Sequence, residues 1–258
     1  MTIATYETII VRFDESICYL QIDRPEANNT ISGQLVAEFN DVLSACEDTA
    51  TVVVLSGSAE VFCYGADFDA LANPLTTTDG EHDGPGPLYD LWMRLATGPY
   101  VTISHVRGKA NAGGIGFVAA SDIVLADESA QFSLSEMLFG LYPACVMPFL
   151  IRRVGFQKAH YLTLMTQPIP AQKAMEWGLV DAYDASSEVL LRRHLQRLRR
   201  LSKVAIRRYK TYMINIGAPL QEMKSPAIAG NVEVFTDAEN LKSITRYVEK
   251  GIFPWEKA

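Results

Sequence analysis

The run TVVVLSG at positions 51–57 is the feature that most constrains how this chain can fold. It is apolar almost throughout and ends at Gly57, which is typical of a parallel strand that is buried on both faces. The same order recurs downstream, where the strand-like run VTISHV (101–106) precedes a glycine-rich turn, a helix near 113–121 and the run IVLAD (123–127). This alternation of strands and helices predicts an α/β fold with a parallel sheet.

The segments on either side of this alternation also have recognisable patterns. The runs TYETIIVRFD and ESICYLQIDR at the N-terminus predict a β-hairpin. After a loop at 25–32, Ser32 is a suitable N-cap for a helix, because apolar residues follow it at helical spacing. Residues 72–87 are rich in Pro, Gly, Thr and acid, which predicts a mobile surface loop that could serve as a lid. From about residue 143 onward the pattern is mostly helical.

The composition is that of a globular protein, because 48% of the residues are apolar and 21% are charged. No run of eighteen or more apolar residues occurs, and the chain does not open on a basic stretch followed by an apolar one, so we expect neither a membrane span nor a signal peptide. The cysteines stand far apart without a CxxC pair, so we expect reduced, mostly buried thiols in a cytoplasmic protein, with no disulfide or zinc site. They are Cys18, Cys46, Cys63 and Cys145.

Charge is distributed unevenly along the chain, whose formal net charge is −7. Residues 192–210 hold nine of the 23 Lys and Arg and no acid, which leaves 14 basic against 30 acidic residues elsewhere. An apolar stripe at helical spacing predicts that this segment docks as one basic helix. The stripe consists of Leu191, Leu195, Leu198, Leu201 and Ala205. Such a helix on an acidic body favours one anionic partner over general nucleic-acid binding, while a solvated charged face is the plainer alternative.

Two glycine-containing segments are candidates for chemistry, namely VFCYGADFDAL (61–71) and HVRGKANAGGIGFVAASD (105–122). In the second, Gly113 and Gly114 precede helical residues, so backbone N–H groups at a partly positive helix start can approach a ligand closely. Neither GxGxxG nor GxxxxGK[ST] occurs in the chain. Taken alone, each segment is more often just a turn.

Taken together with the segments after them in the chain, they resemble the crotonase (enoyl-CoA hydratase/isomerase) superfamily over nearly the whole length. GADF, GKANAGG, SDIVLADESAQFSLSEMLFGLYP (121–143) and AMEWGLVD (174–181) have the order and spacing of that family. The resemblance implies the crotonase fold, with repeated ββα units over residues 1–195 and a C-terminal helical region over 196–258. It also implies assembly as a homotrimer or a dimer of trimers.

A closer resemblance is to the dehydratases of polyketide β-branching, and it rests on FCYGADF, LYDLWMRLATGPYVTISHVRGKANAGG, FGLYPACVMPFLIRR and FPWE. It implies a lyase that dehydrates 3-hydroxy-3-methylglutaryl thioester to 3-methylglutaconyl thioester on acyl carrier protein. No metal or other cofactor is implied besides the phosphopantetheine that carries the substrate, on the carrier or on CoA. The alternatives are a CoA-linked enoyl hydratase or isomerase, the sister decarboxylase, and a non-catalytic scaffold that binds acyl carriers.

The resemblance assigns an oxyanion hole to the backbone N–H groups of Ala66 in GADF and Gly113 in NAGG, which would hold the thioester oxygen as it becomes an enolate. Of the two glutamates that hydratases of the family use, the second matches Glu136 and the first matches Gly116, which has no side chain. This departure argues against ordinary water addition. It implies either that one carboxyl performs both steps, with Glu136 taking the C2 proton and returning it to the departing C3 hydroxyl, or that a non-homologous residue substitutes for the first glutamate. Apolar neighbours in the sequence predict that Glu136 is buried, which would raise the pKa of its carboxyl.

Other residues are weaker candidates, because each can equally serve in packing or capping. For substrate binding they are Gly114, Asp67, Asn111, Tyr142 and Tyr64. For docking of the acidic carrier protein, or of the CoA phosphates, they are Arg193, Arg197 and Arg200. Since the distal carboxylate of the substrate would lie near Glu136, we also expect a compensating cation or polar donor in the site.

Overall fold

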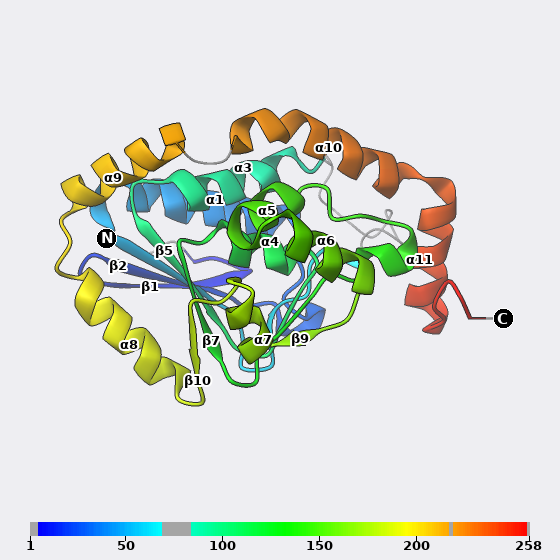
Figure 1. The fold of residues 1–258 in the computed structure, drawn as a ribbon, viewed down its shortest axis with the longest axis horizontal. Coiled ribbons are helices and arrows are strands. Elements are labelled where there is room, and N and C mark those ends of the chain that lie inside the picture. The colour runs from blue at the N-terminus through cyan, green and yellow to red at the C-terminus, as the bar shows by residue number, and fades with distance from the viewer. Residues whose placement is uncertain (1–4, 69–83, 217–218, 257–258) are drawn as a thin grey trace.

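The computed structural model describes residues 5–68, 84–216 and 219–256. Figure 1 shows a central layer of strands with helices above and below it, and α11 (Ala238–Lys250) at the end opposite α8 (Ser187–Leu198). Within these residues no helix is long and apolar enough to cross a membrane. The predicted lid at 72–87 lies mostly outside the described residues. Its last residues belong to α3 (Gly86–Thr97), in whose first turn a proline is tolerated.

The described strands form two sheets. The larger has the order β1 (Ile9–Asp14), β2 (Ile17–Ile22), β3 (Val52–Ser56), β5 (Val101–Val106), β7 (Ile123–Asp127) and β10 (Ala182–Asp184). The smaller has the order β4 (Val61–Cys63), β6 (Lys109–Asn111), β8 (Gln131–Ser133) and β9 (Ile169–Pro170). The predicted hairpin is confirmed, because β1 and β2 pair antiparallel, whereas β2, β3, β5, β7 and β10 run parallel.

Successive strands alternate between the two sheets, and this alternation produces the repeated ββα units. β3, β5 and β7 each enter the larger sheet, and the strand that follows each of them, β4, β6 or β8, enters the smaller one. The helices after these pairs are α3, α4 (Gly113–Ala120) and α5 (Met147–Val154). The predicted crotonase-type α/β architecture is therefore confirmed. The ends of the smaller sheet's strands lead into the loops that carry the candidate site.

Helices cover both faces of the larger sheet. The described helices not yet named are α1 (Gly33–Thr49), α6 (Phe156–Met165), α7 (Ala171–Glu176), α9 (Lys203–Ile216) and α10 (Leu220–Thr236). Two short 3-10 helices, η1 (Pro25–Ala27) and η2 (Glu136–Phe139), lie between the longer elements. Ser32 caps α1 as predicted, since its side chain accepts a hydrogen bond from the N–H of Leu35. From residue 143 onward the described chain is mostly helical, in agreement with the sequence pattern.

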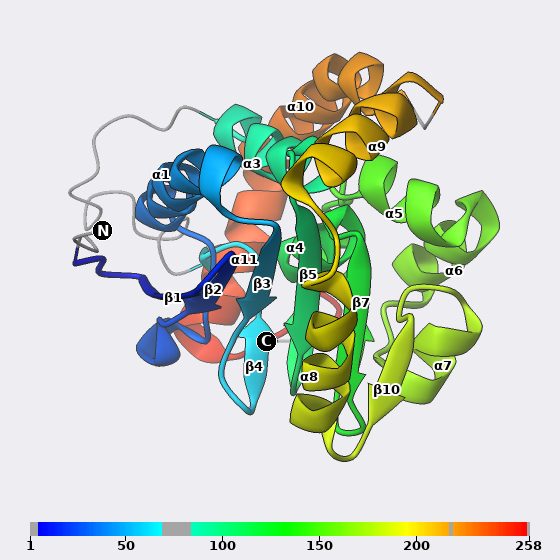
Figure 2. The same cartoon turned by 90° about the vertical axis from the view of Figure 1, so that its left-hand side faces the viewer.

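Strand β3 confirms that the run TVVVLSG is buried on both faces. Val53 and Leu55 belong to the main core, which also includes buried side chains of α1, α3 and α4. Val52 and Val54 face the other way and pack with Leu191 of α8. Figure 2 shows α8 lying across this second face of the sheet. A strand with both faces covered has no polar alternation, which explains the continuous apolar sequence.

The basic segment 192–210 does not form the single helix that its apolar stripe predicted. It is divided between α8 and α9, with residues 199–202 between them. Leu191 and Leu195 are buried, but Leu201 is 43% exposed and Ala205 is also exposed. The physical reason is that α8 docks on the outer face of the sheet, whereas α9 turns away and packs beside α3.

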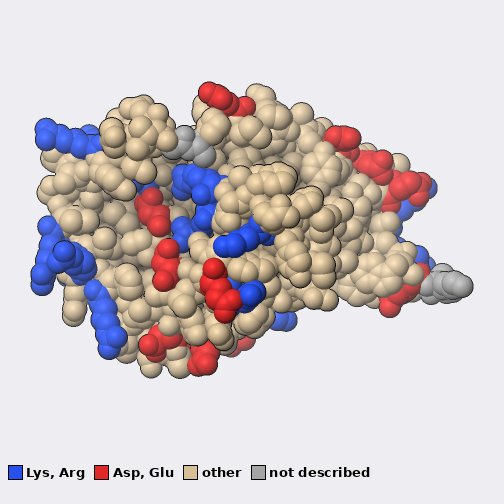
Figure 3. Space-filling model, viewed as in Figure 1, with Lys and Arg blue, Asp and Glu red and all other residues tan. Residues whose placement is uncertain are grey.

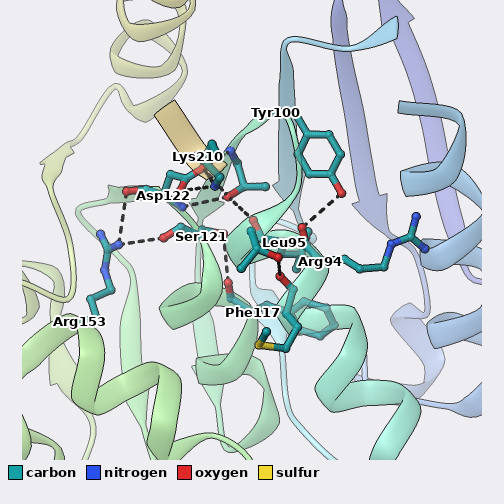
Figure 4. Close-up of polar contacts among 11 residues, drawn as sticks. Arg94, Leu95, Tyr100, Phe117, Ser121, Asp122, Arg153 and Lys210 are labelled. Atoms are coloured by element: carbon teal, nitrogen blue, oxygen red, sulfur yellow. Dashed lines mark hydrogen bonds and ion pairs between the residues drawn. The ribbon is translucent and has the colours of Figure 1, made fainter. Parts of the chain in front are cut away.

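Part of the positive charge of this segment is used inside the molecule. Lys210 of α9 is buried, and its Nζ lies 2.5 and 2.6 Å from the two carboxylate oxygens of Asp122, as Figure 4 shows. Arg153 donates to the carbonyl oxygen of Ser121 beside it. Burial lowers the pKa of Lys210, and the facing carboxylate opposes that effect. This ion pair fastens α9 to the junction between α4 and β7, so it is a structural use of charge.

Candidate active site

A cavity of about 710 Å³ lies where the loops after the strands of the smaller sheet meet the C-terminal helices. Its lining comes from η1 and the loop after it, the loop after β4, the starts of α3 and α4, the segment from η2 to α5, and α10 and α11. Its described lining residues include no Lys, Arg or His, and the charged ones are Glu26, Asp67 and Glu136. The cavity therefore offers carboxyl groups, neutral polar groups and apolar surface to a ligand.

The two predicted oxyanion-hole residues, Ala66 and Gly113, both line this cavity. Gly65 brings their segments together: its φ is +94°, and a Cβ there would lie 2.6 Å from the Cβ of Ala112 and 3.0 Å from the nitrogen of Gly113. Ala112 itself has a φ of 49°, an uncommon conformation for a residue with a side chain. Among the described residues, neither Ala66 nor Gly113 donates its N–H to a backbone carbonyl. Two N–H groups are thus available at one edge of the cavity.

Glu136 also lines the cavity, at the start of η2. Its residue is 7% exposed, so the predicted burial is confirmed. Burial raises the pKa of the carboxyl to about 7, although hydrogen bonds from backbone N–H groups of Ser135 and Glu136 act in the opposite direction. Its Oε2 has no hydrogen-bond partner among the described residues. A carboxyl in this state can accept a proton and give it back near neutral pH.

The missing side chain at Gly116 has a direct structural counterpart in Trp92. A Cβ at Gly116 would lie 2.3 Å from Cζ2 and 2.5 Å from Cε2 of that indole. Trp92 is buried in α3, lines the cavity, and packs edge-on against Phe117 and Phe149. Position 116 therefore cannot hold a second carboxylate unless the indole moves. This contact was not predicted, because nothing in the local sequence pattern pairs Trp92 with Gly116.

Asp67 lies at the cavity but is engaged in structural contacts. Its carboxylate accepts a hydrogen bond from the Thr30 hydroxyl at 3.2 Å and lies 3.4 Å from the Arg24 guanidinium. Arg24 in turn donates to the carbonyl oxygen of Thr30 at 2.6 Å. These contacts hold the loop after β2 against the Ala66 segment. A positioning function for Asp67 is thus better supported than direct substrate binding.

The remaining substrate-binding candidates have different positions relative to the cavity. Asn111 lines the cavity, but its side chain bridges Ser133 and Ser135 at 2.8 and 2.9 Å, so it positions the segment that leads to Glu136. Gly114 is not a lining residue, because it packs against β4, where a Cβ would lie 2.2 Å from the carbonyl oxygen of Cys63.

Tyr64 and Tyr142 are 41% and 37% exposed and stand on the lining of the same cavity. The hydroxyl of Tyr142 donates to the carboxylate of Glu233 at 3.0 Å. Their exposure places both rings where the cavity meets solvent, so they can meet an entering ligand.

One wall of the cavity was not predicted from the sequence. Tyr247 and Val248 of α11, and Phe253 after it, line the cavity together with Phe139 of η2. The ring of Tyr247 lies 5.1 Å from that of Phe139 and 4.8 Å from that of Phe253. In the sequence analysis, the terminal FPWE supported only the resemblance to polyketide dehydratases and did not indicate a cavity wall. The apolar spacing of α11 marks a helix, but it does not say which part of the molecule the helix covers.

The three arginines proposed for carrier docking are exposed, but none of them lines the cavity. Arg193 and Arg197 belong to α8, and Arg200 follows it, at the end of the molecule opposite α11 in Figure 1. Figure 3 shows Lys and Arg side chains gathered at that end. The prediction that this surface receives a carrier is therefore not supported by the geometry of a single chain.

The described residues contain no cluster of three or more His, Cys, Asp or Glu that could hold a metal ion. All four cysteines are buried and free, as predicted. The cavity does contain two backbone N–H groups that have no acceptor within the described part of the chain, and a buried carboxyl whose pKa is raised to about 7. Such an arrangement can stabilise negative charge on a carbonyl oxygen while a proton is transferred at a neighbouring carbon.

Comparison with known proteins agrees with this chemistry. Residues 12–258 match the family described as enoyl-CoA hydratase/isomerase. The chain is 58% identical to bacillaene synthase dehydratase PksH of Bacillus subtilis, over 99% of each chain. It is 33% identical to 2,3-dehydroadipyl-CoA hydratase of Escherichia coli, over 67% of this chain and 68% of that one. The crystal structure of a putative polyketide biosynthesis enoyl-CoA hydratase (pksH) from B. subtilis superimposes with a TM-score of 0.93, covering 97% of this chain and 100% of that one.

Proposed function

The chain belongs to the enoyl-CoA hydratase/isomerase family, and from this premise we propose that it dehydrates 3-hydroxy-3-methylglutaryl thioester to 3-methylglutaconyl thioester in polyketide biosynthesis. The chain is an enzyme of the hydro-lyase type. The substrate is carried by the phosphopantetheine arm of an acyl carrier protein. The name of the B. subtilis relative supports dehydration within a polyketide synthase, and the cavity chemistry supports the individual steps.

The first step forms an enolate. The thioester oxygen accepts hydrogen bonds from the N–H groups of Ala66 and Gly113, which stabilise it as negative charge develops there. This lowers the energy needed to remove a proton from C2. The ionised carboxyl of Glu136 takes that proton, and the electron pair of the C2–H bond moves toward the thioester carbonyl.

The second step expels water. The electron pair of the enolate forms the C2–C3 double bond as the C3–O bond breaks, and Glu136 returns its proton to the departing hydroxyl. One carboxyl performs both transfers on one face of the substrate, so the elimination is syn. A pKa of about 7 suits this double use, because the same group must be a base first and an acid afterwards.

The observation that carries the proposal is the buried carboxyl of Glu136, in a cavity where Trp92 occupies the space that a side chain at position 116 would need. Hydratases that add water to unsubstituted enoyl-CoA use two glutamates. The first of these glutamates has no counterpart in this chain, where position 116 is glycine. The distal carboxylate of the substrate finds no cation among the described lining residues. We therefore propose that it points toward the solvent-facing mouth near Tyr64 and Tyr142.

The experiment is incubation with 3-hydroxy-3-methylglutaryl thioester on carrier protein, followed by mass spectrometry of the acyl group. Loss of water is expected, and loss of carbon dioxide would indicate the sister decarboxylase instead. Crotonyl-CoA is the matched comparison substrate, and its hydration is expected to be slow. Turnover of crotonyl-CoA at the rate of the branched substrate would instead favour the CoA-linked hydratase, and no turnover of any thioester would favour a scaffold.

We also propose assembly as a trimer or a dimer of trimers. Large apolar side chains are exposed on two helices of the single chain, which supports contact with other subunits. On α6 they include Phe156, Tyr161 and Leu164, and on α9 they include Tyr209, Tyr212 and Ile216. Light scattering of the purified protein tests this, and a monomer at micromolar concentration would contradict it.

A further inference from the structure

Two residues that line the cavity each have a buried polar atom without a hydrogen-bond partner among the described residues. One atom is Oε2 of Glu136, whose use is described above, and the other is the indole Nε1 of Trp92. A buried N–H without an acceptor is unfavourable, so a group left in this state on a residue of a ligand cavity calls for an explanation. An acceptor on the substrate supplies one.

The position of the indole is tightly determined. Trp92 is 1% exposed, with Phe117 and Phe149 packed against it at ring-centroid distances of 5.9 and 5.8 Å. Its Cε2, the atom bonded to Nε1, is directed at Gly116, one turn after Gly113 on α4. The six-membered ring of the indole therefore lies against α4, the helix whose first N–H is assigned to the thioester oxygen, and Nε1 is one bond away from this contact. A side chain at position 116 would occupy the same space.

We infer that the indole N–H of Trp92 donates a hydrogen bond to the C3 hydroxyl oxygen of the substrate and orients it toward Glu136. This inference rests on the proposed dehydration. The oxyanion donors serve the thioester oxygen and Glu136 serves the C2 proton first, so the C3 hydroxyl oxygen has no partner in the mechanism until Glu136 returns the proton. Trp92 lines the same cavity as Glu136, and its indole N–H has no acceptor among the described residues.

The chemistry of indole fits this use. Its N–H is a donor only, so it binds a lone pair of the hydroxyl oxygen and does not compete with Glu136 in proton transfer. A neutral hydroxyl is also the better match at this depth, because a carboxylate with one neutral donor would be poorly compensated for its lost hydration. Trp92 is thus a positioning and specificity residue for 3-hydroxyacyl thioesters, while the proton moves through Glu136 alone.

The test uses the indole signal itself. The chain has three tryptophans, so ¹⁵N labelling gives three indole N–H resonances, and Trp92→Phe identifies the one from Trp92. The Glu136→Gln protein is used because it is expected to bind substrate without rapid turnover. With the pantetheine thioester of 3-hydroxy-3-methylglutarate we expect a downfield shift of the Trp92 resonance, and with 3-methylglutaryl pantetheine, which lacks only the hydroxyl, a much smaller one.

Kinetics gives a second readout. Trp92→Phe removes the donor and is expected to lower kcat/KM about 10-fold, the loss typical of one neutral hydrogen bond. Part of this loss is expected in KM, because the hydrogen bond is already formed in the bound substrate, and the pH midpoint that reports Glu136 is expected to stay. Trp177→Phe, a change at a tryptophan outside the cavity lining, is the matched control and should have no effect. Replacing Trp92 by 3-benzothienylalanine exchanges the N–H for sulfur in the same bicyclic shape, so it tests the donor if Trp92→Phe fails to fold.

Equal shifts with both thioesters would show that the donor meets another group, such as the distal carboxylate, and would overturn the inference. Wild-type kcat/KM in the benzothienylalanine protein would overturn it as well. The proposed function fails separately, if the unaltered enzyme releases no water from the carrier-linked substrate. A hydroxyl-dependent shift combined with such inactivity would retain the donor site and reject the reaction.

Discussion

Replacing Glu136 by glutamine is expected to remove activity and, above neutral pH, to increase stability. The activity loss follows from removing the only proton-transfer group assigned to the reaction, for which a decrease of about 10²-fold or more is expected. The stability gain follows from burial. The folded protein holds a carboxyl in an apolar cavity with Oε2 unpartnered among the described residues, and ionisation there is unfavourable.

The size of the gain can be worked from the pKa. Burial raises the pKa of Glu136 from its ordinary value of 4.5 to about 7. Between these values the folded chain binds more protons than the unfolded chain, so stability falls as pH rises through this window and stays lower above it. At ~1.36 kcal/mol for each pH unit, the ionised carboxyl costs roughly 3 kcal/mol at pH 8. Glutamine does not ionise, so Glu136→Gln avoids this cost, while at pH 4 it resembles the protonated wild-type side chain.

The assay is urea unfolding of both proteins at pH 4.5 and pH 8, at equal protein concentration because subunit association also affects stability. Glu38→Gln is the matched control, since Glu38 is buried too. Burial acts to raise the pKa of Glu38, but hydrogen bonds from the N–H groups of Glu7 and Thr8, the Thr8 hydroxyl and Gln34 outweigh it and hold the pKa below its ordinary value. Glu38→Gln should therefore lose stability at pH 8, the opposite sign.

A Glu136→Gln protein that is no more stable than wild type at pH 8 would refute the reasoning, because it would mean that the carboxyl is solvated or paired in the folded chain. Near wild-type turnover by the folded variant would refute the single-carboxyl mechanism. The two measurements are independent, so either can fail without the other.

Three further substitutions and one charge reversal are expected to give defined results. Gly116→Ala places a Cβ 2.3 Å from the Trp92 ring and should cost about 1–3 kcal/mol of unfolding free energy by overpacking, measured in urea. Gly65→Ala, at a φ of +94° and beside the Gly113 segment, should lower kcat about 10²-fold by displacing an oxyanion donor, with little change in the pH midpoint. Lys210→Met leaves the Asp122 carboxylate unpaired and should cost about 2 kcal/mol, a value reduced because that carboxylate is partly exposed. Reversing the charge of the exposed arginines at the α8 end should leave the turnover rate of a CoA thioester within about two-fold of the wild-type rate. The rate with the carrier-linked substrate, measured in parallel across a salt series, tests carrier docking. Those arginines are Arg193, Arg197 and Arg200.

Local sequence by itself determined most of the framework. The apolar run at 51–57, the hairpin before it and the N-cap at Ser32 each depend on interactions within a few residues or on burial of a whole strand, and such signals are present in the chain directly. The burial of Glu136 was predictable for the same reason, since apolar residues flank it on both sides. Its partners in the oxyanion hole came from resemblance, because a backbone N–H leaves no mark in composition.

Tertiary structure alone decided which distant side chains share the cavity. Trp92 and Gly116 belong to different helices, and only the packing of α3 against α4 brings the indole over the glycine. In the same way, the apolar stripe at 191–205 was compatible with one helix, but the chain turns after α8, because α8 packs on the sheet whereas α9 packs beside α3. Helical spacing of apolar residues predicts that one face of a helix is buried, but it does not identify the element against which that face packs. Contacts between elements far apart in the sequence were therefore determined only by the tertiary structure.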